Sequence, residues 1–164
     1  MSRKNLSAAV LYTTKYGTAA KCAAILQEKA KKPLIVVNIK DNPHFDIQPY
    51  SKVILGASVY VERIQREMTA FCRRNEKQLL LKQIGLYICS GDKGRAGRGY
   101  LKLFGKEIHS HAVARKLFGS EIYWHKMNMV EKLAMRVIKK STASSSDLDM
   151  KAIQELAVEM GLLN

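Results

Sequence analysis

The sequence L-S-A-A-V-L-Y-T-T-K-Y-G-T, at residues 6–18, decides how the rest of the chain is interpreted. Its apolar part, Leu6–Tyr12, predicts a buried strand. The alanine-rich segment Ala19–Lys31 that follows predicts a helix. A strand, a short turn and a helix in this order favour an anion site, because the first turn of a helix offers free N–H groups and the positive end of the helix dipole.

The turn between this strand and this helix is rich in hydroxyl groups. It contains one glycine, which lets the backbone approach a ligand closely, and its basic residue is Lys15. The turn carries neither the G-x-x-x-x-G-K-[ST] motif of nucleotide triphosphate sites nor the G-x-G-x-x-G motif of dinucleotide sites. These residues suit a phosphate held by hydroxyls and amides, and they equally suit a threonine-capped turn that binds nothing.

Further apolar segments predict an α/β fold with a doubly wound, five-stranded parallel sheet. Continuous apolar runs, typical of strands covered on both faces, occur at residues 34–37, 53–57 and 84–89. A helical pattern at residues 67–74 separates the third strand from the fourth, and residues 119–124 predict the fifth strand. Ligands of such sheets bind beyond the carboxyl ends of the strands.

The C-terminal half predicts additional helices. Residues 100–117 have helix-like apolar spacing and predict a helical elaboration after the fourth strand. Residues 127–140 predict an amphipathic helix, and after a serine-rich linker at 141–146 a last helix, Met150–Leu162, is capped by Ser146 or Asp147. The apolar face of the amphipathic helix comprises Met129, Val130, Leu133, Val137 and Ile138. That face suits either the core of the domain or an anionic membrane surface.

The composition predicts one domain, residues 1–164. Hydrophobic residues make up 47% of the 164 residues and charged residues 26%, which is typical of globular proteins. No apolar run is long enough to span a bilayer, and the N-terminus does not resemble a signal peptide, so we expect a cytoplasmic protein. Neither the histidines nor the cysteines show a metal-binding spacing, and we expect reduced, buried thiols at Cys22, Cys72 and Cys89.

The chain is strongly basic. Its 28 lysine and arginine residues exceed its 14 aspartate and glutamate residues, which gives a formal net charge of +14. An excess of this size indicates an anionic partner, and nucleic acid, an anionic membrane and an acidic small molecule are the candidates.

Three loops together resemble those of flavodoxins. They follow the first, third and fourth predicted strands, at residues 13–18, 56–60 and 90–94. The closest resemblance is to the flavodoxin-like, menaquinone-dependent protoporphyrinogen dehydrogenases. It is carried by T-T-K-Y-G at residues 13–17, by V-I-L-G-A-S at residues 53–58, and by the segment 127–140 with its linker and final helix. The resemblance implies the strand order 2-1-3-4-5 and noncovalently bound FMN.

The resemblance also implies which residues would hold FMN. Its phosphate would be bound by the first loop, through Thr13, Thr14, Lys15, Tyr16, Gly17 and Thr18. The isoalloxazine ring would lie along the second loop, at Ala57, Ser58, Val59 and Tyr60, with Tyr60 as the stacking partner. The other edge of the ring would meet the third loop at Ser90, Gly91 and Asp92.

The chain departs from the flavodoxin pattern in two ways. The phosphate loop of flavodoxins usually closes with a threonine two residues after the glycine, whereas this chain has Ala19 there and places Thr18 one position earlier. Flavodoxins that act as soluble electron carriers are acidic, because they dock on basic partners, whereas this chain is basic.

Basic residues crowd the segment after the fourth predicted strand, at Lys93, Arg95, Arg98 and Lys102. We hypothesise that they bind the carboxylates of an acidic substrate, because the guanidinium fork can contact both oxygens of a carboxylate. A solvated loop is the alternative. The run G-R-A-G-R-G also resembles nucleic-acid-binding tails, but Tyr100 is its single nearby aromatic residue, so nucleic acid ranks low as a partner.

The sequence therefore favours an FMN-dependent oxidoreductase, by resemblance one that oxidises protoporphyrinogen with a quinone as acceptor. Peripheral contact with the inner membrane through residues 127–140 would bring such an enzyme to a quinone pool. Two alternatives stay open: a basic flavodoxin-type electron carrier that serves an acidic redox partner, and a flavodoxin-fold module that has lost FMN and binds an anionic surface.

Overall fold

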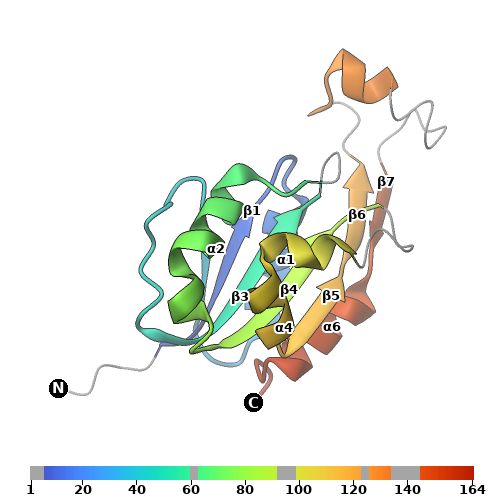
Figure 1. Cartoon of the computed structure of the whole chain (residues 1–164). Helices are drawn as coiled ribbons and strands as arrows, with labels where there is room; N and C mark the ends of the chain where they lie inside the picture. Colours follow the sequence, from blue (N-terminus) through green and yellow to red (C-terminus); the bar gives the residue numbers. More distant parts are fainter. Residues whose placement is uncertain (1–5, 60–62, 92–98, 123–125, 134–144) are drawn as a thin grey trace.

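A five-stranded parallel sheet forms the centre of the molecule, with the strand order β2-β1-β3-β4-β5 (Figure 1). The structure is a computed structural model, and it describes residues 6–59, 63–91, 99–122, 126–133 and 145–164. The strands are β1 (Leu6–Thr13), β2 (Leu34–Asn38), β3 (Tyr50–Ser58), β4 (Gln83–Cys89) and β5 (Ala114–Leu117). Every pairing within this sheet is parallel. The predicted fold class and strand order are therefore confirmed.

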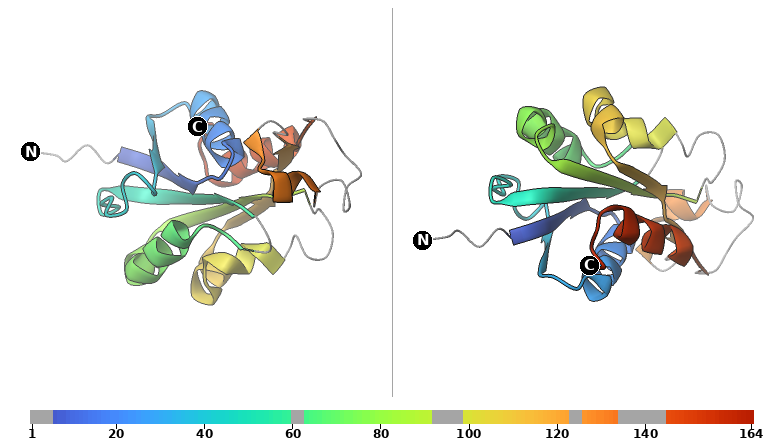
Figure 2. Two further views of the ribbon diagram at one scale, coloured as in Figure 1. Left: turned by 90° about the horizontal axis from the view of Figure 1, so that it is seen from above. Right: turned by 90° about the horizontal axis from the view of Figure 1, so that it is seen from below.

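Helices cover both faces of the sheet, as Figure 2 shows from above and below. Helices α1 (Thr18–Lys29) and α6 (Met150–Glu159) pack together on one face. Helix α2 (Arg66–Leu79), the 3-10 helix η1 (Leu101–Phe104) and α4 (Lys106–His111) pack together on the other. The helical elaboration predicted after the fourth strand is present as η1 and α4.

Two apolar layers result, one on each side of the sheet. Leu11, Leu55 and Leu86 belong to the layer under α2 and α4, whereas Val10 and Ile54 belong to the layer under α1 and α6. All of these side chains are fully buried. Successive strand residues alternate between the two layers, which is why the strands are continuously apolar rather than alternating in polarity.

The prediction of the fifth strand at residues 119–124 is wrong. Strand β5 lies at Ala114–Leu117 instead, at the end of the segment 100–117, whose apolar spacing predicts a helical elaboration. Its sequence A-R-K-L is too short for hydrophobic periodicity to distinguish a strand from a helix. Residues Gly119–Ile122 form β6, which pairs antiparallel with β7 (Ser145–Leu148) in a separate two-stranded sheet.

The segment before the last helix also differs from its prediction. Ser145–Leu148 forms strand β7 rather than the end of a linker, and residues 141–144 lie outside the described residues. The cap of α6 is Asp149, whose Oδ1 accepts a hydrogen bond from the Ala152 N–H at 2.9 Å, and neither Ser146 nor Asp147 caps this helix. Pairing with β6 extends the chain up to Leu148, so the helix starts later than the serine content suggests.

The cysteine prediction agrees with the structure. Cys22, Cys72 and Cys89 are free and buried. The Sγ atoms of Cys22 on α1 and Cys89 at the end of β4 are 3.7 Å apart. The contact with Cys22, and then burial, raise the pKa of the Cys89 thiol well above its ordinary value.

Tyr87 fixes how α1 packs on the sheet. It is fully buried, its hydroxyl donates to the Ala19 carbonyl at 2.8 Å, and its ring stacks on Phe118 with centroids 4.6 Å apart. Gly56 lies opposite Tyr87 in the pairing of β3 with β4, and a Cβ at Gly56 would overlap the phenol ring. The absence of a side chain at position 56 thus makes room for the aromatic residue that holds α1 in place.

We therefore expect Gly56→Ala to lower the free energy of unfolding by about 3 kcal/mol, because the added methyl group overpacks a core in which Tyr87 cannot move aside. Urea unfolding followed by circular dichroism measures this loss. Gly99→Ala is the matched control, since nothing lies near a Cβ at that position, and it should change the stability by less than about 0.5 kcal/mol. Equal midpoints for the Gly56 variant and the wild type would contradict the assigned role of Tyr87.

Candidate functional site

The candidate site lies at the carboxyl ends of β1 and β3, which are neighbours in the sheet. Thr13 at the end of β1 is in register with Ala57 near the end of β3. The chain leaves β1 toward α1 on one face and leaves β3 toward α2 on the opposite face. Connections that diverge in this way open a crevice at the sheet edge, and such a switch point is where doubly wound sheets bind ligands.

The turn after β1 presents the start of α1 to this crevice. Gly17 is the N-cap residue with a φ of 100°, a left-handed conformation that favours glycine. Thr14 stabilises the turn, because its Oγ1 accepts a hydrogen bond from the Gly17 N–H at 2.9 Å. Among the residues that the structure describes, no side chain caps α1, so the first-turn N–H groups beginning at Thr18 are available to another acceptor.

Thr13 and Ala57 have structural positions rather than exposed ones. The Thr13 hydroxyl donates to Gln65 Oε1 at 2.9 Å and so joins the end of β1 to the N-cap residue of α2. Ala57 is fully buried in the apolar layer under α2. The structure thus places both side chains beneath the crevice, where the hydrogen bond of Thr13 joins its two walls.

A pocket of about 360 Å³ spans the crevice. It reaches from the turn after β1 to the loop before α2 and the first turn of that helix. Its lining is cationic on both sides, with one carboxylate, and comprises Thr14, Lys15, Lys40, Arg63, Ile64, Gln65, Arg66 and Glu67. A pocket of this charge beside an uncapped helix N-terminus favours an anionic group such as a phosphate.

Glu131 lies against the turn, and sequence reasoning missed it. This residue is only 6% exposed, and one of its oxygens accepts from Lys15 Nζ at 2.6 Å. The Tyr16 hydroxyl donates to the other oxygen. The signal that could have revealed this residue is the spacing N-x-x-E, because Asn128 Oδ1 accepts from the Glu131 N–H at 2.8 Å and the Asn128 N–H donates back to Glu131 at 3.3 Å.

The contact with Glu131 changes the chemistry of the turn. Burial, and then the hydrogen bond to Glu131, raise the pKa of Tyr16 to about 12, so the phenol stays neutral and keeps donating at physiological pH. Lys15 is neutralised by a carboxylate that comes from a segment more than a hundred residues later in the chain. The turn therefore carries less positive charge than its sequence indicates.

The second and third loops meet at the same edge of the sheet. The Val59 N–H donates to the Cys89 carbonyl at 3.0 Å, and the Ser90 N–H donates to the Gly119 carbonyl at 2.8 Å. Ser58 Oγ is buried and has no hydrogen-bond partner among the described residues. A buried hydroxyl without a partner costs free energy unless a ligand supplies one, so Ser58 fits a site for a polar group.

The remaining candidate residues fall outside what the structure describes. Tyr60, Asp92, Lys93, Arg95 and Arg98 belong to this group. Lys102 is described and lies exposed in η1, and Gly91 follows Ser90 at the end of β4. Among the described residues, no three His, Cys, Asp or Glu side chains gather in a way that could hold a metal ion.

The predicted amphipathic helix, residues 127–140, is described only over its first part, residues 127–133. Its apolar residues point to solvent there, since Met129 is 81%, Val130 76% and Leu133 62% exposed. Glu131 is the residue of this segment that is buried against the domain. The part of the chain that the structure describes contains no helix that is both long and apolar enough to cross a membrane.

Comparison with known proteins identifies the family and supports the fold. Residues 9–149 match the family described as "Flavodoxin domain". No curated protein matches the chain. Among solved structures, a short-chain flavodoxin associated with a non-canonical PDU bacterial microcompartment is 17% identical, with a TM-score of 0.56 and 96% of each chain covered.

Two further structures share the fold. A flavodoxin, WrbA-like protein from Agrobacterium tumefaciens is 13% identical with a TM-score of 0.53, covering 96% of this chain and 95% of that chain. Rubredoxin:oxygen oxidoreductase from Desulfovibrio gigas is 13% identical with a TM-score of 0.56, and the match covers 98% of this chain but only 35% of that enzyme. With the family match covering most of its length, the chain belongs to the flavodoxin domain family.

Proposed function

We propose that the chain binds FMN noncovalently and catalyses a flavin-dependent oxidation. The observation that carries this proposal is the cationic pocket at the β1/β3 switch point of a flavodoxin domain, which is lined by the turn that leads into α1. FMN has the phosphate that this turn suits. When bound, it would accept and release the electrons of the reaction, while the protein supplies binding and orientation.

The described residues fit such a cofactor at both ends. Thr14, Gly17 and the first turn of α1 would hold the phosphate, with Lys15 as the nearby cation. Ser58 and Val59 would flank the ring at the end of β3, and the buried Ser58 hydroxyl would gain the hydrogen-bond partner that it lacks among the described residues. Ser90 and Gly91 would meet the ring from the end of β4.

For the reaction itself, we propose the oxidation of protoporphyrinogen with a quinone as acceptor. The basic surface supports an acidic substrate, since the formal net charge is +14 and three arginines lie in or beside the crevice. The same charge also suits an acidic redox protein, so a basic electron carrier is the second candidate. Both candidates require FMN, and they differ in whether a small molecule is oxidised.

We also propose that residues 126–133 make peripheral contact with an anionic membrane. The exposure of Met129, Val130 and Leu133 supports this contact, because these side chains have no apolar cover in the described part of the molecule. Lys126 and Lys132 lie beside them in the sequence and would meet lipid phosphates. A quinone acceptor would be reached from the same surface.

The function is tested by anaerobic reconstitution followed by turnover. The purified protein should bind FMN and should then convert protoporphyrinogen to protoporphyrin with matching reduction of an added quinone, followed by absorbance. FMN binding without porphyrinogen oxidation, but with electron transfer to an acidic redox protein, would favour the carrier. A protein that cannot be reconstituted with FMN would contradict both.

Glu131→Gln should tighten FMN binding about tenfold, because it removes a carboxylate that neutralises Lys15 beside the proposed phosphate site. Quenching of flavin fluorescence on titration measures the dissociation constant. The gain should shrink at high salt, and the affinity for riboflavin, which has no phosphate, should not change.

The matched control for this variant is Glu28→Gln, which removes an exposed carboxylate from the far end of α1. It should leave the affinity for FMN unchanged. An equal gain in riboflavin affinity for the Glu131 variant would show that the substitution acts through the shape of the turn, and the electrostatic explanation would then be rejected.

The membrane contact predicts that the double variant Met129→Glu and Leu133→Glu binds phosphatidylglycerol vesicles about tenfold more weakly than the wild type in a flotation assay, because charged side chains oppose insertion of this surface. Leu81→Glu is the matched control, since Leu81 is 87% exposed in the turn after α2. Absence of wild-type binding, or an equal loss for the Leu81 variant, would reject the contact.

A further inference from the structure

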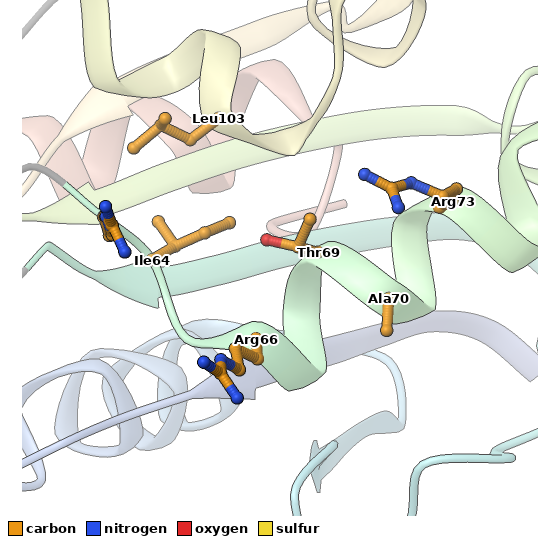
Figure 3. A pocket seen from close by; sticks show the side chains of 7 residues that line it. Ile64, Arg66, Thr69, Ala70, Arg73 and Leu103 are labelled. Atoms are coloured by element: carbon orange, nitrogen blue, oxygen red, sulfur yellow. The ribbon is translucent and has the colours of Figure 1, made fainter.

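A second pocket of about 360 Å³ lies between α2 and η1, on the face of the sheet opposite α1 (Figure 3). Thr69 and Arg73 project from α2 on the side of Leu103, which faces them from η1. Ile64, just before α2, is buried and forms part of the apolar lining. The full lining comprises Arg63, Ile64, Arg66, Thr69, Ala70, Arg73 and Leu103.

Three guanidinium groups, those of Arg63, Arg66 and Arg73, surround this apolar lining. No ion pair or side-chain hydrogen bond joins any of the three to another described residue. Other arginines of the fold are engaged: Arg74 donates to the Pro43 carbonyl at 2.6 Å, and Arg115 donates to the His109 carbonyl at 2.7 Å. Like charges that gather at one pocket repel each other, and an anionic ligand relieves this repulsion.

This pocket adjoins the crevice pocket. Arg63, Ile64 and Arg66 line both, so the two pockets share one wall, formed by the loop before α2 and the first turn of that helix. The opposite wall of the crevice carries Thr14 and Lys15 of the turn after β1. A ligand in the arginine pocket would therefore lie next to a cofactor bound at the switch point.

We propose that the arginine pocket binds the carboxylates of the substrate, an apolar molecule with at least two acidic groups. Ile64, Ala70 and Leu103 would contact its apolar body, and Arg63, Arg66 and Arg73 would bind its carboxylates through their paired N–H groups. A concave pocket of this volume suits a small molecule rather than a protein surface. The assignment rests on the proposed function and differs from the earlier hypothesis for Lys93, Arg95 and Arg98.

The test uses the FMN-loaded protein and a ligand that cannot be oxidised further. Protoporphyrin, which carries two carboxylates, is titrated by fluorescence in parallel with its dimethyl ester, which carries none. The wild type should bind the acid at least tenfold more tightly than the ester. Arg63→Gln and Arg73→Gln should each weaken binding of the acid about tenfold and leave binding of the ester unchanged, because each removes a charge-assisted contact.

Lys77→Gln is the matched control, because Lys77 is an exposed cation of α2 that does not line the pocket. It should leave both affinities unchanged. Flavin absorbance and thermal unfolding of each variant show whether FMN and the fold are retained. Unchanged binding of the acid in the arginine variants, or an equal loss in the Lys77 variant, would overturn the proposal.

The outcomes distinguish a failure of the pocket proposal from a failure of the proposed reaction. Arginine-dependent binding of the acid without porphyrinogen oxidation would support the pocket and reject the reaction. Porphyrinogen oxidation that proceeds with unchanged Michaelis constants in the arginine variants would support the reaction and overturn the pocket. Two results together would overturn the assignment to a small molecule. They are equal affinity of the wild type for the acid and the ester, and displacement of the bound acid by an acidic protein.

Discussion

The site depends on one constraint, the parallel pairing of β1 with β3 in a sheet that is covered on both faces. Because α1 and α2 must cover opposite faces, the chain leaves these two neighbouring strands in opposite directions. The polar groups that cannot enter either apolar layer collect where the two connections separate. The hydrogen bond from Thr13 to Gln65 joins the two sides at that point. This arrangement brings three features close together: the turn after β1, the arginines at the start of α2, and the buried Ser58 hydroxyl.

The positive charge of the chain is not spread evenly over the two sides of the crevice. The turn after β1, which looks cationic in sequence, is matched by the buried carboxylate of Glu131. The arginines at the start of α2 have no such partner among the described residues. A phosphate would therefore meet a site whose positive charge comes from backbone N–H groups and the far wall as much as from Lys15. The arginines without a carboxylate partner line the adjoining arginine pocket, where a second anionic ligand would bind.

Most of the fold could be predicted from the sequence because burial on both faces makes the central strands β1, β3 and β4 largely apolar, and the partly buried edge strand β2 is apolar as well. Strand β5 could not, since A-R-K-L is short and sits at the sheet edge with Arg115 exposed. The turn after β1 was identified because its elements are adjacent in sequence. Glu131 and the Arg63–Arg73 pocket were missed because each depends on contacts between distant segments, which no local pattern records. The site residues Tyr60 and Asp92 stay predictions, as they lie outside the described residues.

The pairing of β6 with β7 has a consequence for how this fold tolerates change. Ile122 and Ser145 are register partners, so the two ends of the intervening chain are held beside each other by the ladder itself. The Phe118 carbonyl accepts from the Asp149 N–H at 2.7 Å and fixes the base of this pair to the main sheet. Glu131, which lies in this intervening chain, is held separately by its ion pair with Lys15 on the turn after β1. An insertion between β6 and β7 is therefore tolerated only where it leaves both this ladder and the contact of Glu131 with the turn after β1 in place.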